Sequence, residues 1–398
     1  MADLLSIDAA LERVLAHARP LEVEDVPLDD AAGRVLAEDA LATVDLPPFA
    51  SSAMDGFAIR AADVPGTLPV AFRIAAGRTA TAPLAPGETS GIATGAPIPD
   101  GADTVVPLEV VVDHGNSVEF PSVAIAGSNV RPRGGDLSVG GLVVGAGQTL
   151  GPAQLAGLAA AGVGVARCGR RPRVTVLTTG TELRPPGSTL AAGQIYEANG
   201  VALAAAFAAT GAVVERLASV NDDPDAHREA LRRGLEADVL VTSGGVSVGP
   251  HDLVRATARE LGVEEIFWGV AMRPGKPLAF GVLGDTLVFG LPGNPVSSLV
   301  AAELFVRPAL LALQGHAQPR PHFEAGELTV ALHRSHERDD LVRARARVGE
   351  DGIVGLDPLT GQESHMIGRA AGANALVLVP RGAGELAAGS SVRYLRLR

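Results

Sequence analysis

Residues 237–252, ADVLVTSGGVSVGPHD, decide the fold of the central part of this chain. The apolar run Val239-Leu240-Val241 predicts a fully buried strand, and Asp252 stands where a helix begins. A strand that feeds a glycine-rich turn at a helix start gathers backbone N–H groups around an anion, and a following carboxylate can hold a metal ion that shares the phosphate oxygens. The stretch therefore indicates a phosphate or nucleotide site, with an ordinary strand-to-helix loop as the alternative. Its candidate binding residues are Ser243, Gly244, Gly245, Ser247 and Gly249.

Strands and helices alternate on both sides of this stretch. Strands are expected at 174–177, 212–220 and 286–289, and helices at 200–210, 223–235, 253–261 and 296–313. Such alternation predicts a doubly wound, mostly parallel sheet with ligands at the carboxyl ends of its strands. Glu182, Asp222 and Asp252 follow three strands, and separated acids beside a glycine loop suit Mg²⁺, which takes few carboxylates together with phosphate and water. The alternative for Asp222, or for its neighbour Asp223, is a helix N-cap.

Two basic features suggest oxyanion binding. Arg273 and Lys276 flank a Pro-Gly turn in VAMRPGKP (270–277), and the prolines stiffen that turn, so both cations could face one oxyanion. Surface loop cations are the alternative. In an otherwise acidic chain, 316–347 carries six arginines, which indicate either a local anion site or a solvated strand face. They are Arg320, Arg334, Arg338, Arg343, Arg345 and Arg347.

The N-terminal and C-terminal parts predict further units. Residues 1–24 have helical apolar spacing, and 66–135 are short β-like runs separated by glycine and proline. A rigid Pro-Pro entry at 47–48 leads to Asp55, an acid beside a glycine that marks either a site or a turn. Residues 139–166 carry a helix that starts near Pro152 and return to the N-terminal element. After residue 317, β-like alternation indicates a small barrel or sandwich.

We therefore expect a multidomain α+β chain, and its 398 residues agree with about two to four domains. The expected units are a discontinuous N-terminal helical and linker domain (1–24 and 138–171), an inserted β domain (25–137), the α/β domain (172–316) and a C-terminal β domain (317–398).

Composition narrows the functional classes. A net charge of −12 argues against general nucleic-acid binding. The single cysteine, Cys168, excludes an internal disulfide and a cysteine-cluster metal site, and it fits a reducing cytoplasm. No uninterrupted apolar run reaches about 18 residues, so no transmembrane span is expected. The N-terminal stretch carries acids and is unlike a secretory signal. We expect a cytoplasmic protein without nucleic-acid or membrane partners.

Several strings together resemble the molybdopterin molybdenumtransferase family, which includes MoeA and the E domain of gephyrin. They occur in the family's order: PPFASSAMDGFAIR (47–60), ATGAPIPDGADTVVPLE (93–109), NVRPRGGD (129–136), TTGTEL (178–183) with GQIYEANG (193–200), TSGGVSVGPHD (242–252), VAMRPGKPLAFG (270–281), GLPGNPVSS (290–298) and GQESH (361–365). The resemblance implies a MogA-like, molybdopterin-binding α/β domain and a C-terminal β barrel. It also implies insertion of molybdate into adenylylated molybdopterin with Mg²⁺, which releases AMP. The resemblance further implies an elongated homodimer, with the active site between the α/β domain of one subunit and the β domains of the other.

The resemblance also assigns residues. The acids Asp55, Glu182, Asp222 and Asp252 match functional positions, and Asp252 with Glu182 would hold Mg²⁺. Arg273, Lys276, Ser297, Arg343 and Ser364 match the family's molybdate pocket, with Pro292 and Pro295 shaping the loop before Ser297. Thr94, Arg133 and Asp136 match further substrate positions. The molybdopterin adenylyltransferase is a candidate partner.

Six departures from the family pattern weaken any statement about oxyanion affinity. They are Phe57 for Tyr, Thr181 for Asp, Arg273 for Lys, Gly269 where a relative carries Lys, Glu197 for Asp, and Pro250-His251 before Asp252. Two other functions remain open at this point. One is the adenylyltransferase itself, which shares the α/β domain and the TSGG loop. The other is a non-enzymatic scaffold that binds a receptor peptide, against which the retained acids and cations argue.

Overall fold

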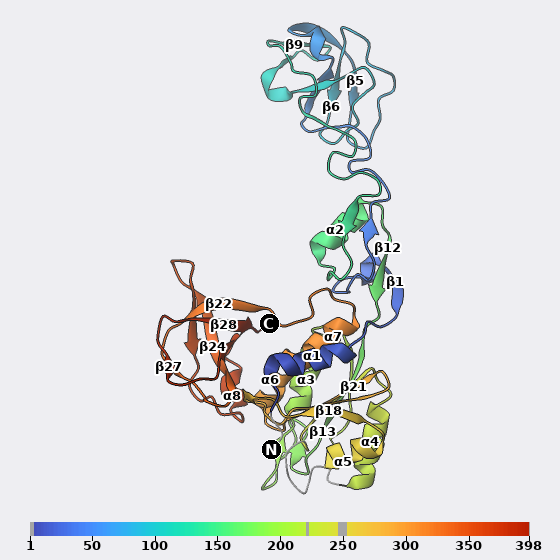
Figure 1. The fold of residues 1–398 in the computed structure, drawn as a ribbon. Helices are drawn as coiled ribbons and strands as arrows, with labels where there is room; N and C mark the ends of the chain where they lie inside the picture. Colours follow the sequence, from blue (N-terminus) through green and yellow to red (C-terminus); the bar gives the residue numbers. More distant parts are fainter. Residues whose placement is uncertain (1–3, 220–222, 246–252, 398) are drawn as a thin grey trace.

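The computed structural model describes residues 4–219, 223–245 and 253–397 as an elongated molecule with four packed regions. Figure 1 shows a β domain with β5, β6 and β9 at one end, a slender connector with α2, β1 and β12, and an α/β domain at the other end. A β barrel lies beside the α/β domain. The mixed α+β architecture predicted from the sequence is confirmed.

The α/β domain contains a six-stranded sheet in the order β16-β13-β17-β21-β20-β18. The first four strands are parallel, and β20 and β18 add an antiparallel edge that the sequence analysis did not predict. The strands are β13 (Arg173–Thr178), β16 (Val213–Arg216), β17 (Val239–Ser243), β18 (Glu264–Trp268), β20 (Ala279–Leu283) and β21 (Thr286–Leu291). The helices are α3 (Asn199–Ala208), α4 (Pro224–Gly234), α5 (Leu253–Glu260), α6 (Pro295–Ala301) and α7 (Arg307–Leu313). The predicted mostly parallel sheet is thus confirmed.

A long apolar helix forms the centre of this domain. Between α6 and α7 lies one π-helical turn, η4 (Ala302–Val306), just before Pro308. Proline has no N–H and clashes with the carbonyl four residues back, so a wider turn relieves the helix at this point. Pro295–Leu313 is apolar enough in length and composition to cross a membrane, with a mean hydropathy of 1.7, but 72% of it is buried in the fold. That burial is typical of a core helix.

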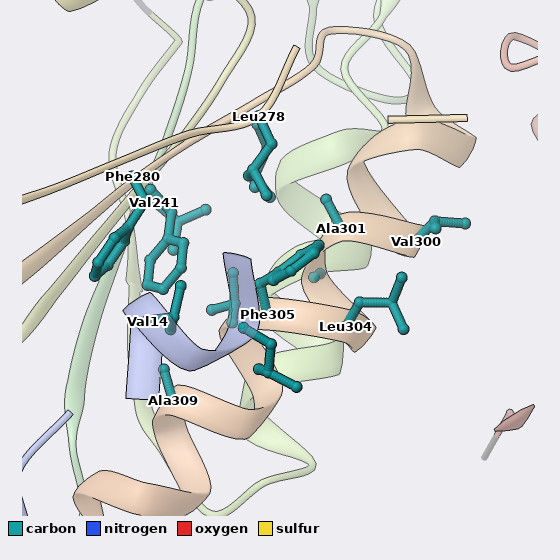
Figure 2. Packing of buried hydrophobic residues seen from close by; sticks show 14 of the residues in the cluster. Val14, Val241, Leu278, Phe280, Val300, Ala301, Leu304, Phe305 and Ala309 are labelled. Carbon is teal, nitrogen blue, oxygen red and sulfur yellow. The ribbon is translucent and has the colours of Figure 1, made fainter. Parts of the chain in front are cut away.

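The N-terminal helix α1 (Ile7–His17) packs on this central helix. Ser6 caps α1 by accepting a hydrogen bond from the Ala9 N–H. Its apolar face, including Val14, joins the same core as Phe280 and Phe305, as Figure 2 shows. The helix predicted for 1–24 is therefore shorter, and it packs against the α/β domain. The expected domain boundaries remain predictions.

The connector consists of two short antiparallel ladders and a helix. β1 (Val23–Pro27) pairs with β12 (Val165–Gly169), and β2 (Ala40–Leu41) pairs with β11 (Leu142–Val144). The expected boundary between residues 24 and 25 falls inside β1. Helix α2 (Pro152–Ala160) covers a small core that contains the buried Cys168. The chain thus leaves the connector near residue 45 and returns near residue 137, which places the β domain between its two halves.

The connector is fastened to the α/β domain by Arg170. Its guanidinium donates to both carboxylate oxygens of Asp238, at 2.9 Å each, and to Glu22. Burial alone would raise the pKa of Asp238, but the hydrogen bonds from Arg170 and the Arg173 N–H outweigh it and lower that pKa. The Asp238 side chain is only 12% exposed, so this pair ties the start of β17 to the connector.

The distal β domain has a six-stranded sheet in the order β7-β4-β6-β5-β9-β8. Phe57 on β4 is fully buried and meets Phe120 edge to face. The strands are β4 (Gly56–Ile59), β5 (Gly66–Ile74), β6 (Thr89–Ile92), β7 (Thr104–Pro107), β8 (Val112–Asp113) and β9 (Ser117–Phe120), with β3 (Ser51–Ser52) and β10 (Val130–Arg131) paired beside them. Short 3₁₀ turns occur at Leu28–Asp30, Ala61–Asp63 and Leu108–Val110.

The C-terminal domain is a closed five-stranded barrel, which decides between the predicted barrel and sandwich. Its strands run β24-β25-β22-β28-β26, and β26 pairs back onto β24. They are β22 (Phe323–Leu328), β24 (Asp339–Val348), β25 (Val354–Pro358), β26 (Ala375–Val379) and β28 (Ser391–Arg396). Two residues of the α/β domain, β19 (Met272–Arg273), extend β24 in parallel. The barrel also carries the short ladder β23 (Leu332–His333) with β27 (Glu385–Leu386) and the single-turn helix α8 (Ile367–Ala370).

Candidate functional site

Three strand ends of the α/β domain meet at the glycine loop. The Ser243 carbonyl at the end of β17 accepts from the Thr179 N–H after β13, at 3.1 Å. The Gly244 N–H donates to the Leu291 carbonyl at the end of β21, also at 3.1 Å. The sequence prediction that these loops converge at the carboxyl edge of the sheet therefore holds for the described strand ends.

Glycine is required where the loop begins. Gly244 has a φ of +100° and Gly245 a φ of +64°. A Cβ on Gly244 would lie 2.8 Å from the carbonyl oxygen and hydroxyl of Thr179, and one on Gly245 would lie 2.6 Å from Val254. Gly293, after β21, lies beside this loop, since a Cβ on Gly293 would be in ordinary contact with the Gly244 Cα at 3.6 Å. Side chains are excluded here, and the backbone is accessible to a ligand.

Two residues that the sequence analysis did not select brace this loop. The Asn199 side-chain amide donates to the Ser243 hydroxyl at 2.9 Å and to the Gly293 carbonyl at 2.7 Å. Ser298 donates to the Pro292 carbonyl and lies 3.1 Å from the Ser243 hydroxyl oxygen. Asn199 lies in the quoted GQIYEANG string and Ser298 in GLPGNPVSS, so the strings marked both residues but not their role.

Glu182 is the described acid at this edge of the sheet. It follows β13, is exposed, and its carboxylate makes no hydrogen bond within 4–219, 223–245 and 253–397. The described residues form no group of three or more His, Cys, Asp or Glu that could hold a metal by itself. Mg²⁺ usually takes one or two carboxylates and completes its shell with water and phosphate. A free carboxylate on the loop after β13, which contacts the glycine loop through Thr179, fits that ion.

Four predicted residues of this edge, Asp222, Ser247, Gly249 and Asp252, lie outside the described residues. Asp223, the alternative considered for a helix cap, is the N-cap of α4 and accepts from the Asp225 N–H at 3.0 Å. The capping role expected for one of the two neighbouring acids thus belongs to Asp223.

The two cations of the Pro-Gly turn have different surroundings. Arg273 donates through Nε, at 2.8 Å, and Nη2 to the two carboxylate oxygens of Asp340 in the barrel. Lys276 is exposed, and its ammonium makes no hydrogen bond or ion pair within the described parts of the chain. Lys276 is also the single lysine among the 33 lysines and arginines of the sequence. One cation of the expected pair is therefore neutralised, and the other is free.

Ser297 lies next to this turn, and Ser364 lies against the start of the same helix, α6. The carbonyl of Ser297 would be 3.7 Å from a Cβ on Gly275, which places the first turn of α6 against the cation turn. Ser364, from the barrel, accepts from the Asn294 side-chain amide at 2.9 Å, and its carbonyl accepts from the Val296 N–H at 3.1 Å. The Pro292–Pro295 turn thus lies between the glycine loop, which Gly293 approaches, and the start of α6, which packs against the cation turn.

Arg343 lies behind the Ser364 loop. It is 3% exposed, and its guanidinium donates to the carbonyls of Gly361, Glu363 and Met366. Burial lowers the pKa of Arg343. Its hydrogen-bonding groups hold the loop that presents Ser364, so the structure places it as a support of the pocket predicted from the sequence.

Three further arginines of 316–347 differ in their surroundings. Arg334 donates to the carbonyls of Pro380 and Arg381, and Arg345 donates to the Gly372 carbonyl. These cations close loops of the barrel, whereas Arg347 is exposed. The contacts of Arg334 and Arg345 are therefore those of structural residues and do not indicate an anion site at these two positions.

The predicted residues of the β domain, called here the second cluster, take part in separate contacts. The Asp55 carboxylate accepts from the Thr94 N–H at 2.7 Å, and a Cβ on Gly56 would lie 2.2 Å from the Val106 carbonyl. Arg133 pairs with Asp45 at 2.6 Å, and Asp136 is exposed. This cluster belongs to the domain at the far end of the molecule from the glycine loop, so one chain does not bring the two clusters together (Figure 1).

Three departures from the family strings have structural explanations. Phe57 is a core residue under the Arg73 guanidinium, 5.3 Å from its ring centre, so the missing hydroxyl does not affect the exposed cluster. Gly269 has a φ of +91°, a conformation that favours glycine. Glu197 is buried, pairs with Arg216 at 2.8 Å and accepts from the Gly200 N–H.

Comparison with known proteins agrees with this arrangement along the whole chain. Three family models match in order: the MoeA N-terminal region at 5–162, the probable molybdopterin-binding domain at 175–312 and the MoeA C-terminal region at 325–397. Molybdopterin molybdenumtransferase 2 of Mycobacterium tuberculosis is 38% identical over 402 residues, covering 96% of this chain and 97% of the relative. The chain belongs to the molybdopterin molybdenumtransferase family.

Two further relatives support this membership. The molybdopterin molybdenumtransferase of Haemophilus influenzae is 34% identical and covers 98% of both chains. The crystal structure of the molybdopterin biosynthesis MoeA protein of Pyrococcus horikoshii superposes with a TM-score of 0.83 at 31% identity, covering 100% of both chains. The resemblance drawn from the motif strings is thereby confirmed, and with it the expectation of a transferase enzyme.

Proposed function

We propose that this molybdenumtransferase-family protein inserts molybdenum from molybdate into adenylylated molybdopterin and releases AMP. The observation that supports it most is the continuity of two anion-binding elements at one edge of the sheet. Gly293 lies beside Gly244, and the Ser243 hydroxyl lies 3.1 Å from that of Ser298. The preceding residue, Ser297, lies beside the turn that carries Lys276. A phosphoanhydride on the glycine loop and an oxyanion at the turn would then be neighbours.

Each element would bind one substrate. The backbone N–H group of Gly245 would hold the phosphates, because no side chain obstructs it, whereas the Gly244 N–H already donates to the Leu291 carbonyl. The Lys276 ammonium and the hydroxyls of Ser297 and Ser364 would hold molybdate, since a charged donor with hydroxyl donors matches a tetrahedral dianion. Bringing both substrates to one edge lowers the entropic cost of their reaction.

Mg²⁺ is the proposed cofactor. Glu182 would hold it, together with Asp252, which the family resemblance places after the glycine loop. The ion would neutralise the phosphoanhydride so that AMP leaves as a stabilised anion. The unpaired carboxylate of Glu182 supports this assignment, as its position leaves coordination sites for phosphate and water.

The complete site is proposed to need two copies of the chain. Asp55, Thr94, Arg133 and Asp136 lie in the domain far from the glycine loop of the same chain (Figure 1), whereas the resemblance assigns both clusters to one reaction. A homodimer would place the β domain of one copy near the α/β domain of the other. A cytoplasmic location and transient contact with a molybdopterin adenylyltransferase complete the proposal, and the buried single Cys168 is compatible with a reducing compartment.

One experiment tests the reaction directly. Purified protein is incubated with adenylylated molybdopterin, Mg²⁺ and molybdate, and both AMP release and activation of a cofactor-free molybdoenzyme are measured. Molybdate-dependent AMP release supports the proposal. Pyrophosphate formation from ATP and molybdopterin would instead assign the adenylyltransferase reaction, and the absence of both activities would leave the scaffold function. Glu182→Gln should lower AMP release and raise the Mg²⁺ requirement.

A further inference from the structure

A buried carboxylate of the barrel reaches into the cation turn of the α/β domain. Asp340 is 3% exposed and lies on β24, where it receives two hydrogen bonds from Arg273 in a bidentate pair. Backbone contacts continue this junction, because Arg273 lies opposite Asp340 in the β19–β24 ladder and the Asp339 N–H donates to the Ala271 carbonyl at 3.0 Å. The turn is thus attached to the barrel at one defined point.

The attachment fixes the position of Lys276. Its carbonyl accepts from the Val270 N–H at 3.0 Å and from the Leu278 N–H at 2.9 Å, which closes the turn as a small loop. Arg273 lies midway around that loop, and Lys276 lies where the loop closes onto Val270. A bidentate guanidinium–carboxylate pair has a defined orientation, whereas a lysine at position 273 would make a less directional contact.

We infer that Asp340 is a positioning residue for the oxyanion site: it orients the 270–278 turn through Arg273 and leaves Lys276 as the uncompensated cation. The inference rests on the proposed function for its molybdate readout. It differs from the expectation that Arg273 and Lys276 both bind molybdate directly, because it assigns the Arg273 charge to the barrel carboxylate.

Direct binding of molybdate by Arg273 and positioning of the turn by Asp340 predict opposite changes in molybdate affinity for one substitution. If Arg273 were a direct ligand held back by Asp340, Asp340→Asn would free a positive charge and tighten molybdate binding. If Asp340 positions the turn, Asp340→Asn loosens it and weakens binding. Arg273→Met should then have the same effect as Asp340→Asn, and the double variant should be no weaker than either single variant, since one connection is lost in all three.

The first measurement is a molybdate titration of AMP release at saturating adenylylated molybdopterin. We expect Asp340→Asn and Arg273→Met each to raise the half-saturating molybdate concentration by about three- to tenfold, in the range of couplings between contacting residues. The rate at saturating molybdate should stay within about twofold. Asp340→Glu keeps the carboxylate and should recover part of the affinity. Asp339→Asn is the matched control, because Asp339 accepts only from the Arg381 N–H among the described residues and should leave affinity unchanged.

The second measurement does not depend on the reaction. Because Lys276 is the only lysine, an amine-reactive ester labels one side chain, and peptide mass spectrometry separates it from the N-terminal amine. Asp340→Asn should change the labelling rate of Lys276 at least about twofold at a temperature where the protein remains folded, and Asp339→Asn should not. If the wild-type protein does not use molybdate, the proposed function is refuted, but the labelling of Lys276 still tests whether Asp340 positions the turn. Unchanged labelling, or tighter molybdate binding by Asp340→Asn, would overturn the inference.

Discussion

Among substitutions that remove an exposed cation, Lys276→Met should weaken the use of molybdate the most. The ammonium is exposed and unpaired in the described structure, at the turn that touches Ser297. A hydrogen bond to a charged group contributes about 1.5–3 kcal/mol when it is well shielded. Exposure places Lys276 at the low end of that range, so we expect a loss of about 1.4 kcal/mol, which is tenfold in affinity.

The assay is AMP release as a function of molybdate at saturating adenylylated molybdopterin and Mg²⁺. The half-saturating molybdate concentration should rise about tenfold, whereas the concentration dependence on the pterin substrate should change little, because its phosphates are assigned to the glycine loop. Lys276→Arg keeps the charge and should lie between wild type and Lys276→Met. Arg347→Met removes an exposed cation of the barrel and should leave the titration unchanged, which controls for net charge.

Two results would refute this reasoning. If Lys276→Met leaves the molybdate titration unchanged, the ammonium is a solvated surface charge. If Lys276→Met and Arg347→Met shift the titration equally, the effect comes from the overall field of the protein and not from a contact at the turn.

Three other predictions concern stability. Gly244→Ala should lower the free energy of unfolding by about 1–3 kcal/mol more than Gly187→Ala in urea titrations, because both positions have positive φ but only the former Cβ would meet Thr179. Asp238→Ala should cost about 2 kcal/mol by leaving the Arg170 guanidinium without its buried partner, and equal stability of this variant and Asp285→Ala, which removes an exposed acid, would contradict that role. Hydrogen bonds from Arg396 and then Tyr394 lower the pKa of Glu324 to about 2 from 4.5, so its contribution is complete above pH 4.5 and is lost as the pH falls toward 2. Glu324→Gln should therefore be less stable than wild type at neutral pH, with the difference shrinking over that interval in pH-dependent thermal melts; a difference independent of pH would contradict the pairing.

The central α/β domain was predictable because its strands are apolar runs that end at clear turn residues. Val239–Val241 ends in a glycine loop, and the resulting strand β17 is completely buried. The strands β18 and β20 were missed because they form the antiparallel edge of the sheet. In Glu264–Trp268 only Phe267 is buried, so the strand shows no clear period. The extent of α1 was overestimated, since the helix ends at His17 and the next residues lead into β1.

The loops of the candidate site could be predicted from the sequence, but the ion pairs and hydrogen bonds of its cations could not. The glycine loop, the Pro292–Pro295 turn and the cation turn are continuous in sequence, and each has a local signature. Asp340 is 67 residues from Arg273, and its role depends on the barrel docking beside the α/β domain. The two aspartates at the start of β24 were the available signal, but consecutive acids at a strand start usually face solvent. Arg343 likewise looked like a ligand, because its carbonyl partners form only after the 361–366 loop folds over it.

These pairings change the expected chemistry of the pocket. Of the cations that the sequence placed there, Arg273 is held by a carboxylate and Arg343 by three carbonyls, so within the described structure Lys276 has the uncommitted charge. A single flexible ammonium with neighbouring hydroxyls binds a dianion less tightly than two fixed cations would, because part of the anion's charge stays uncompensated. Weaker binding of molybdate suits an oxyanion that must give up its metal. An interaction that stabilises the bound substrate as strongly as the transition state adds nothing to the rate of transfer. The rigid Arg273–Asp340 pair would then contribute geometry, while Lys276 contributes charge that can follow the oxyanion as it reacts.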